Sequence, residues 1–358
     1  MEEMIDSQIN TLGINDFLNA AKKYTENVFP DMNISNLFEK SINGHLSDIF
    51  DIGVIQKLLF DEIYVAISLM ASLMIVIIIH SIFKAIIENL ENQATSQIVY
   101  FVQYLIIVTI LINTFVTILD LTKETIANVV SFMNLLIPLL ITLMLTTGTL
   151  VTTSVCQPVL VFLTSFIGNF INLFLIPLLM ISITISIISN VSDKVQIDKL
   201  SKFMKSFIVW ILGIILTIFT CVLSLEGTLS SSVDGLTAKT AKVAVSNFIP
   251  IVGKIMGDTV DSVIGCGNIL KNSLGTIGII IIVGIVLLPM IKILTLWFSF
   301  KLTSAMCEVV ADNKIVKLME QIADSYKVLL AVLCSVSIMF IIGITIVIKI
   351  TNSALMYR

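Results

Sequence analysis

The chain of 358 residues is 57% hydrophobic and only 13% charged, with a formal net charge of −4 and a mean hydropathy of +1.03. The charged groups are too few to cover the surface of a 39.4 kDa globule in water. The composition therefore excludes a soluble fold. It also argues against nucleic-acid binding, because Lys and Arg do not cluster with interleaved aromatic residues anywhere in the sequence.

Residues 1–62 form an acidic segment with eleven acidic residues and four lysines. Apolar residues recur at helical spacing from Ile14 to Val28 and again from Leu46 to Leu59, which predicts two or three short amphipathic helices. The start, Met1-Glu2-Glu3-Met4, has neither the basic nor the apolar region of a signal peptide, so we expect such a peptide to be absent or already removed.

Hydrophobic spans follow near residues 63–83, 98–119, 206–225, 276–300 and 328–348. Between the second and third of these, Thr125 to Ser192 contains no Asp, Glu, Lys, Arg or His. As a helix this block would be about 100 Å long, enough to cross a hydrocarbon core of about 30 Å two or three times. The sequence therefore predicts an all-α polytopic membrane domain over residues 63–350, with seven or eight transmembrane helices and a short tail, 351–358.

Lysines constrain the topology of this domain. One short loop holds Lys194, Lys199, Lys202 and Lys205, and another holds Lys301, Lys314, Lys317 and Lys327. The positive-inside rule places both loops in the cytoplasm. Two solutions remain, which are an external N-terminus with three crossings in the uncharged block, or an internal one with two. Because only Lys57 precedes the first span closely, we favour eight spans and an extracytoplasmic segment 1–62; two crossings with a re-entrant segment fit almost as well.

The uncharged block contains a possible internal repeat. Phe132-Met-Asn134-Leu-Leu-Ile-Pro138 is echoed by Phe170-Ile-Asn172-Leu-Phe-Leu-Ile-Pro177, with one residue inserted. Transporters use paired, proline-interrupted spans to open backbone groups onto a midplane site, so Asn134, Pro138, Asn172 and Pro177 are candidates for a pore or packing site. The alternative is chance similarity, which is favoured because the block is built from few residue types.

Residues 226–275 are too polar for an ordinary span, yet apolar residues from Val245 to Ile264 form a helical stripe. Gly253 and Gly257 would admit another helix closely, and Pro250 would bend the segment. We expect this amphipathic segment to be re-entrant or extracytoplasmic, lining a pore or docking a partner; the alternative is an interfacial helix between two spans. The partner-facing candidates are Asp234, Lys239, Lys242, Pro250, Lys254, Asp258 and Asp261.

Three ionisable residues stand in apolar runs: His80, Lys84 and Lys292. Intramembrane charge suggests function, although snorkelling near span ends explains each of them as well. The chain has two histidines, five isolated cysteines without CxxC spacing, and no GxSxG, HExxH or GxxxxGK[ST] motif. We therefore expect no catalytic residues, no metal site, no cofactor and no enzymatic activity.

Several long blocks in the second half can be placed in a family. They are Ser192-Asp-Lys-Val-Gln-Ile-Asp-Lys-Leu, Asp234-Gly-Leu-Thr-Ala-Lys-Thr-Ala-Lys, Asn247-Phe-Ile-Pro-Ile-Val-Gly-Lys-Ile-Met-Gly-Asp-Thr-Val-Asp and Leu288-Pro-Met-Ile-Lys-Ile-Leu-Thr-Leu. Their sequences resemble the stage III sporulation protein AE family, and the likeness extends more loosely back to about Gln56.

The resemblance implies a multi-pass protein of an endospore-forming bacterium, made in the mother cell and placed in the membrane around the forespore. It implies work within a channel-like assembly, with the other stage III A-operon proteins and a forespore membrane protein as partners, that sustains late forespore gene expression. Family members generally begin with a signal peptide, which is missing from this sequence. Two rival hypotheses are a secondary transporter of a small solute, suggested by the Asn-Pro spans, His80 and Lys292, and a non-conducting scaffold that anchors partner rings.

Overall fold

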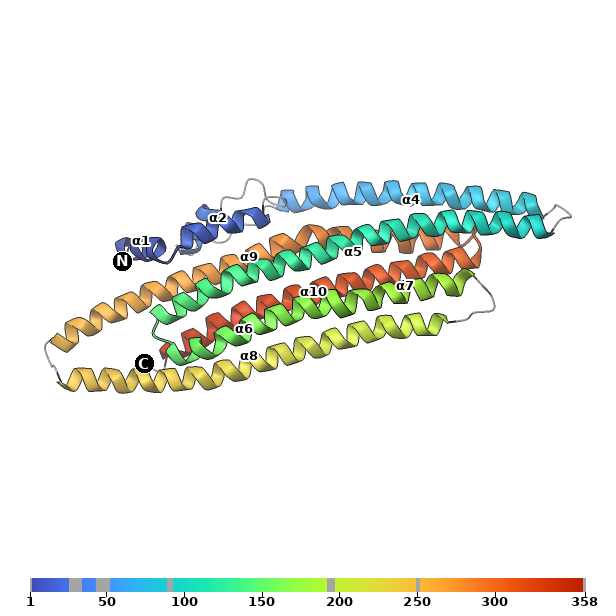
Figure 1. The fold of residues 1–358 in the computed structure, drawn as a ribbon. Helices are drawn as coiled ribbons and strands as arrows, with labels where there is room; N and C mark the ends of the chain where they lie inside the picture. The colour runs from blue at the N-terminus through green and yellow to red at the C-terminus, as the bar shows by residue number, and fades with distance from the viewer. Residues whose placement is uncertain are drawn as a thin grey trace.

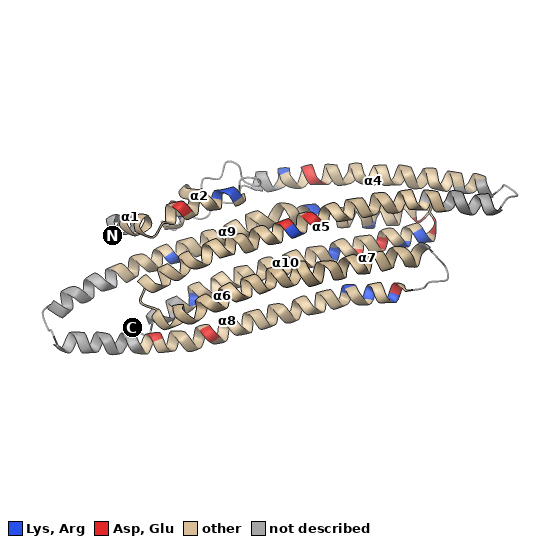
Figure 2. Ribbon diagram, in the orientation of Figure 1, with Lys and Arg blue, Asp and Glu red and all other residues tan. Residues whose placement is uncertain are grey.

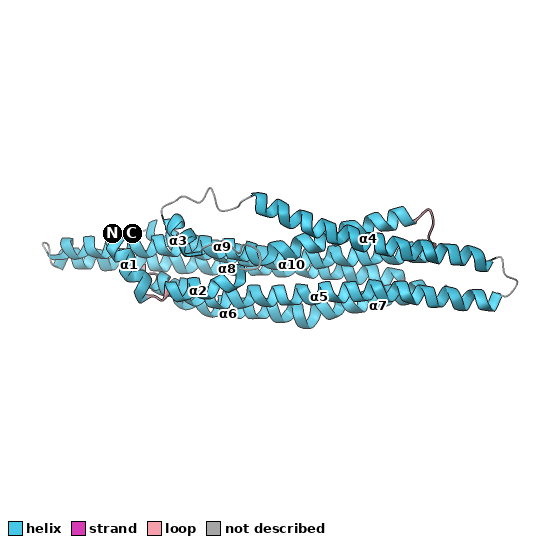
Figure 3. Ribbon diagram, turned by 90° about the horizontal axis from the view of Figure 1, so that it is seen from above, coloured by secondary structure: helices cyan, strands magenta, loops and turns pink. Residues whose placement is uncertain are grey.

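The computed structural model describes residues 2–25, 34–42, 52–88, 93–191, 197–248 and 252–356. These residues are almost entirely helical and lie in one elongated bundle (Figures 1 and 3). Among them, six helical units are long and apolar enough to cross a membrane. The predicted class, an all-α polytopic membrane protein, is confirmed.

Consecutive long units run in opposite directions along the bundle (Figure 1). They are α4 (Ile52–Glu88), α5 (Gln93–Thr146), α6 (Leu150–Phe170) continued through the π-helical segment η1 (Ile171–Leu175) into α7 (Ile176–Val191), α8 (Asp198–Phe248), α9 (Val252–Cys307) and α10 (Asn313–Met356). Three short helices precede them: α1 (Glu2–Thr11), α2 (Ile14–Thr25) and α3 (Ile34–Ile42).

The prediction of seven or eight spans is wrong. The span expected at residues 98–119 and the beginning of the uncharged block belong to one helix, α5, and the rest of the block is the single unit α6–η1–α7. The charges between them do not end α5, because they stand on its exposed side, where Asp120 and Lys123 form an i,i+3 ion pair of 3.3 Å. The charged residues that we expected to separate two spans are therefore part of one continuous helix.

A tight turn joins α5 to α6. Gly148 ends α5 with a φ of 75°, the left-handed conformation that favours glycine at a helix C-terminus. The backbone N–H and the hydroxyl of Thr149 both donate to the carbonyl of Met144, at 3.3 and 2.8 Å. This turn makes the second half of α5 and α6 antiparallel neighbours.

Apolar side chains fill the space between the helices. The rings of Phe115 on α5 and Phe300 on α9 lie 5.4 and 5.2 Å from that of Tyr326 on α10. Helices also approach closely at Gly278, where an added Cβ would lie 2.6 Å from Cδ2 of Leu136. Packing rather than hydrogen bonding holds this middle part of the bundle together.

Three helices carry uncharged stretches of about 20 residues each, close to the thickness of a bilayer core. They run from Lys205 to Glu226 on α8, from Lys271 to Lys292 on α9 and from Lys327 to Lys349 on α10. Contacts near both ends place the stretches side by side, since Lys205 reaches Gln321 and Lys271 reaches Asn352. We call this level of α8, α9 and α10, together with the neighbouring part of α6–α7, the uncharged band.

The short N-terminal helices lie toward one end of the bundle, away from the far end of the α4–α5 hairpin (Figures 1 and 3). The rings of Phe17 and Tyr24 on α2 lie 6.0 and 5.9 Å from that of Phe132 on α5. The amphipathic helix predicted from Ile14 is thus confirmed, with its apolar face buried. In the second predicted stripe, residues 46–51 lie outside the described residues, and from Ile52 onward it belongs to α4, so the boundary at residue 62 falls within a helix.

Candidate functional site

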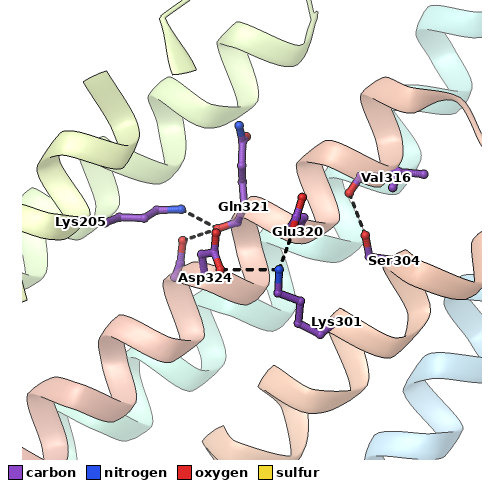
Figure 4. Close-up of polar contacts among 8 residues, drawn as sticks. Lys205, Lys301, Ser304, Val316, Glu320, Gln321 and Asp324 are labelled. Atoms are coloured by element: carbon purple, nitrogen blue, oxygen red, sulfur yellow. Dashed lines mark hydrogen bonds and ion pairs between the residues drawn. The ribbon is translucent and has the colours of Figure 1, made fainter. Parts of the chain in front are cut away.

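The densest polar contacts in the described structure lie where α7, α8, α9 and α10 end or begin, at the level of the lysine-rich loops (Figures 2 and 4). We call this level the lysine-rich end and its interacting side chains the polar cluster. Its members are Ser182, Ser186, Asn190, Asp198, Ser201, Lys205, Lys301, Ser304, Lys317, Glu320, Gln321 and Asp324.

Lys205 is the buried cation of the polar cluster. Its side chain projects from α8 and its Nζ donates to the backbone carbonyl of Gln321 on α10, at 2.5 Å (Figure 4). The same carbonyl accepts a hydrogen bond from the hydroxyl of Ser325, at 2.9 Å. Because burying an ammonium group requires acceptors, this contact ties α8 to one fixed point on α10.

The side-chain amide of Gln321 joins three helices. Its Oε1 accepts from Nδ2 of Asn190 on α7 at 2.7 Å, and its Nε2 donates to Oδ1 of Asp198 at the start of α8, at 3.2 Å. Asn190 also donates to the carbonyl of Ser186, at 2.7 Å, and Asp198 also pairs with Lys317. A carboxylate at the N-terminus of α8 is itself favoured by the helix dipole.

Three buried serines form hydrogen bonds between α7 and α8. The hydroxyl of Ser182 donates to the carbonyl of Ser201 at 3.0 Å, and the hydroxyls of Ser186 and Ser201 are 2.6 Å apart. Small hydroxyl side chains let two membrane helices approach closely and bond across the interface.

Three outer contacts join α9 to α10. Nζ of Lys301 lies 2.6 Å from Oε1 of Glu320 and 3.9 Å from Oδ1 of Asp324, and the hydroxyl of Ser304 donates to the carbonyl of Val316 at 3.1 Å (Figure 4). The ion pair is partly solvent-exposed, unlike the contacts of Lys205 and Asn190.

The arrangement of the polar cluster is typical of a structural contact between helices and not of a catalytic site. Its buried hydroxyl, amide and ammonium groups bond to one another or to backbone carbonyls, so they fix the relative positions of four helices. Within the described residues, no group of three His, Cys, Asp or Glu side chains is placed to bind a metal ion.

Asp234, predicted to face a partner, is instead buried and caps α6 from α8. Its two carboxylate oxygens accept from the backbone N–H groups of Val151 and Thr152, at 2.9 and 2.8 Å. The residue at the N-cap position, Thr149, makes no side-chain capping hydrogen bond, and its hydroxyl donates to the carbonyl of Met144 instead. A carboxylate from another helix takes over the role, which corrects the prediction for this residue.

Lys271 occupies the same end of the bundle, opposite the lysine-rich end. Its side chain is fully buried, and Nζ donates to Oδ1 of Asn352 on α10 at 2.9 Å. Asn352 lies near the C-terminus of α10, where exposed carbonyl groups favour a cation.

The two Asn-Pro copies lie in different local structures. Asn134 and Pro138 are exposed on α5, which continues as an α-helix through the proline. Asn172 lies within η1, with its Oδ1 buried, and Pro177 follows as an exposed residue. The residue inserted in the second copy corresponds to a π-helical turn, which holds one residue more than an α-turn. A pore role for these four residues stays a prediction.

The amphipathic segment 226–275 is not a separate helix, since its backbone continues α8 and begins α9. Pro250 lies outside the described residues, as do the side chains of Lys84, Lys239, Lys242, Lys254, Asp258 and Asp261, and the surroundings of Gly253 and Gly257. The partner-facing and helix-packing roles of these residues stay predictions.

His80 and Lys292 have different surroundings. His80 is buried, with Nε2 3.5 Å from Oδ2 of Asp312, and its neighbour Ser81 donates to the carbonyl of Val310 at 2.8 Å. Both contacts attach α4 to the turn between α9 and α10. Lys292 is partly buried on α9, three residues after Pro289, at the edge of the uncharged band.

The polar cluster was not predicted from the sequence, although its residues follow a recognisable pattern. Polar residues recur every four positions on each of three helices, and such residues share one helix face. They are Ser182, Ser186 and Asn190 on α7, Ser201 and Lys205 on α8, and Lys317, Gln321 and Ser325 on α10. Lys205 was interpreted only as a topology signal, which hid its place on one of these faces.

The sequence profile described as Stage III sporulation protein AE matches residues 32–351. The Stage III sporulation protein AE of Bacillus subtilis (strain 168) is 31% identical over 171 residues, which are 48% of this chain and 43% of that protein. The matched segment thus spans less than half of that relative. No solved structure matches the chain.

Proposed function

Because the chain belongs to the stage III sporulation protein AE family, we propose that it acts in sporulation as the membrane subunit of a channel-like or secretion-like assembly between mother cell and forespore. The observation that carries this proposal is the family match over residues 32–351, a range that includes all six membrane-crossing units. The proposed location is the mother-cell-derived membrane around the forespore. The proposed partners are the other stage III A-operon proteins and a forespore membrane protein.

The interior of the uncharged band supports a platform role within that assembly. Buried hydroxyl groups there are turned back onto their own helices, as in Ser337, which donates to the carbonyl of Leu333 at 2.8 Å. The surrounding core is apolar. Any path for solutes would then run between this chain and its neighbours, and the chain's own contribution is non-enzymatic.

A non-conducting scaffold is the second candidate, and the polar cluster favours it. Interlocked side chains on α7, α8 and α10 keep one end of the bundle fixed, as an anchor for partner rings requires. The transporter hypothesis has less support, because His80 is engaged with Asp312 and one Asn-Pro copy lies on an exposed helix face.

The test is deletion of the gene in its own spore-forming host, with growth, engulfment and a late forespore reporter followed by microscopy. We expect normal growth and complete engulfment, followed by loss of late forespore expression, and full restoration by the intact chain. Normal spores with a nutrient or ion defect would contradict the proposal and favour a transporter. If the reporter is lost while purified complexes assemble and stay impermeable, the scaffold is the better description.

A further inference from the structure

The outward face of α2 is polar and charged. Its apolar residues, such as Phe17 and Leu18, are buried against the bundle, and the polar residues between them are exposed. These exposed residues are Asn15, Asp16, Asn19, Lys22 and Lys23. Such a face is ordinary in water, but hydrocarbon strongly disfavours it. The level of α2 along the bundle therefore decides what can surround it.

Close contacts join four helices at one level inside the uncharged band. An added Cβ at Gly278 on α9 would lie 2.6 Å from Cδ2 of Leu136 on α5 and 3.4 Å from Cδ1 of Ile344 on α10. At the neighbouring residue of α10, an added Cβ on Gly343 would lie 3.1 Å from Cζ of Phe219 on α8. These contacts fall well within the uncharged stretches of α8, α9 and α10, so they mark the middle of the band.

The basic end of α2 lies at this level. The rings of Phe17 and Tyr24 lie 6.0 and 5.9 Å from that of Phe132, which is one helical turn from the contact of α5 with α9. Lys22 and Lys23 directly precede Tyr24. Figure 2 shows the basic end of α2 level with the uncharged parts of α8 and α10. If lipid covered this side of the bundle, both ammonium groups would stand in hydrocarbon.

The exposed stripe of α5 beside α2 is also polar at this level. Phe132, which contacts α2, follows Ser131 by one residue, or about 100° around the helix, so α2 flanks the side where Ser131 is exposed. Leu135 and Leu145 are the large apolar side chains exposed along this part of α5. The other exposed residues, spaced three or four apart, are Glu124, Ala127, Ser131, Asn134, Pro138 and Thr142. The stripe thus contains the first Asn-Pro copy.

The outward side of α8 at the same level is different. Large apolar side chains, including Trp210 and Ile218, are exposed there. Thr217 is exposed between them, but its hydroxyl donates to the carbonyl of Gly213 on its own helix, at 2.8 Å. This side of the bundle suits contact with lipid, whereas the side formed by α2 and the α5 stripe places ammonium and amide groups at the same level.

We propose that the outward face of α2 and the exposed stripe of α5 border a water-filled path at membrane level, while α8 faces lipid. The path runs between this chain and its neighbours in the assembly, so the inference rests on the proposed function and assigns the side of the chain that borders the path. Asp16, Lys22 and Lys23 give this side both signs of charge, and Asn19 and Asn134 add neutral amides. Such a lining fits small hydrophilic solutes and does not select ions of one sign.

Thiol labelling in membrane fragments of the sporulating host tests which side is wet. In a full-length chain whose five cysteines are replaced by alanine, Asn19→Cys or Asn134→Cys is introduced. The matched control is Ile218→Cys, an exposed position of α8 at the same level. A charged maleimide reacts with the thiolate, which forms in water and not in hydrocarbon. We expect labelling at Asn19→Cys and Asn134→Cys that is several-fold faster than at Ile218→Cys.

Three labelling results would overturn the proposal. Slow labelling at all three positions, with a photoreactive lipid attached at Asn134→Cys, would show that lipid covers the polar side. Fast labelling at all three would show that the uncharged band does not lie in the bilayer. Labelling of Asn134→Cys that is fast only when the chain is produced alone, in cells that do not sporulate, would show that a partner protein covers this side.

A pair of substitutions tests whether the wet side borders the path. Ser131→Leu with Asn134→Leu makes the α5 stripe apolar, which lipid would tolerate but a water-filled path would not. We expect the late forespore reporter to fall several-fold, with growth and the amount of the protein in the membrane unchanged. The polar pair Ser131→Thr with Asn134→Gln should keep the reporter, which controls for a packing defect.

The outcomes separate this inference from the proposed function. An unchanged reporter with the leucine pair, in a host where gene deletion abolishes the reporter, would contradict the path along α2 and α5 and leave the sporulation role intact. An unchanged reporter after deletion of the gene would contradict the proposed function itself.

Discussion

The two ends of the uncharged band are closed by polar groups in different ways. At the lysine-rich end, side chains of α7, α8 and α10 bond to one another, and Gln321 takes part in contacts with both other helices. At the opposite end the contacts are separate: Asp234 caps α6 and Lys271 meets Asn352. Members of a network depend on one another, whereas separate contacts contribute independently. The comparison therefore predicts coupled losses at one end and additive losses at the other.

The largest expected effect is at the separate end, from Asp234→Leu. The substitution leaves the buried N–H groups of Val151 and Thr152 without their acceptor, and an unsatisfied buried donor costs about 1–3 kcal/mol. We expect a loss of about 2–4 kcal/mol in the free energy of unfolding, measured by SDS titration in mild detergent micelles. Asp234→Asn keeps one acceptor oxygen and should lose about half as much. A leucine variant as stable as the asparagine variant would show that this carboxylate does not cap α6.

Gln321→Leu is expected to cost about 2 kcal/mol in the same titration, because it leaves one N–H of the buried Asn190 amide without an acceptor, although the bond to Ser186 remains, and removes a donor to Asp198. The network interpretation is tested by the partner substitution. Adding Asn190→Leu should cost less than the sum of the two single losses, since it removes the N–H that Gln321→Leu leaves without an acceptor. Combining Gln321→Leu with Asp234→Leu, at opposite ends, should be additive. Strict additivity for the neighbouring pair would mean that the polar cluster is a set of separate contacts.

The apolar packing between the ends provides a third comparison. An added Cβ at Gly168 on α6 would lie 2.9 Å from Cγ2 of Val130 on α5, whereas nothing lies within 4 Å of one at Gly213 on α8. Gly168→Leu should therefore destabilise the chain by about 1–2 kcal/mol through overpacking. The matched control, Gly213→Leu, should be neutral or slightly stabilising, because glycine is a poor helix former. Equal effects at the two glycines would contradict the α5–α6 packing.

Composition and periodicity predicted the class of this fold and the buried face of α2, because apolar spans and amphipathic stripes are local properties of the sequence. They did not predict the number of long helices. Asp120, Lys123 and Glu124 look like a loop between two spans, but a helix longer than the bilayer core can carry charges on an exposed face. A length argument based on one bilayer thickness cannot recognise such a helix.

The candidate site was predictable only in part, because it depends on contacts between distant segments. The four-residue spacing of polar residues on α7, α8 and α10 was visible, but nothing local shows that three such faces meet. Asp234 was misinterpreted for the same reason: an acidic residue in a polar segment looks solvent-exposed until its acceptor role toward the start of α6, 82 and 83 residues away, is known.

The smallest expected effect concerns the exposed margin of the lysine-rich end. Lys301 and Glu320 approach to 2.6 Å, but their side chains are 37% and 53% exposed, so water and salt screen the pair. Lys301→Met should change the free energy of unfolding by less than about 1 kcal/mol. In about 0.5 M salt, the difference in free energy from the unmodified chain should disappear. Gln321→Leu, whose partners are buried, should keep its loss in the same salt. Lys301→Met could instead lower the free energy of unfolding as much as Gln321→Leu, and by the same amount at high salt. The Lys301–Glu320 ion pair would then belong to the hydrogen-bonded network of the polar cluster and not to its exposed margin.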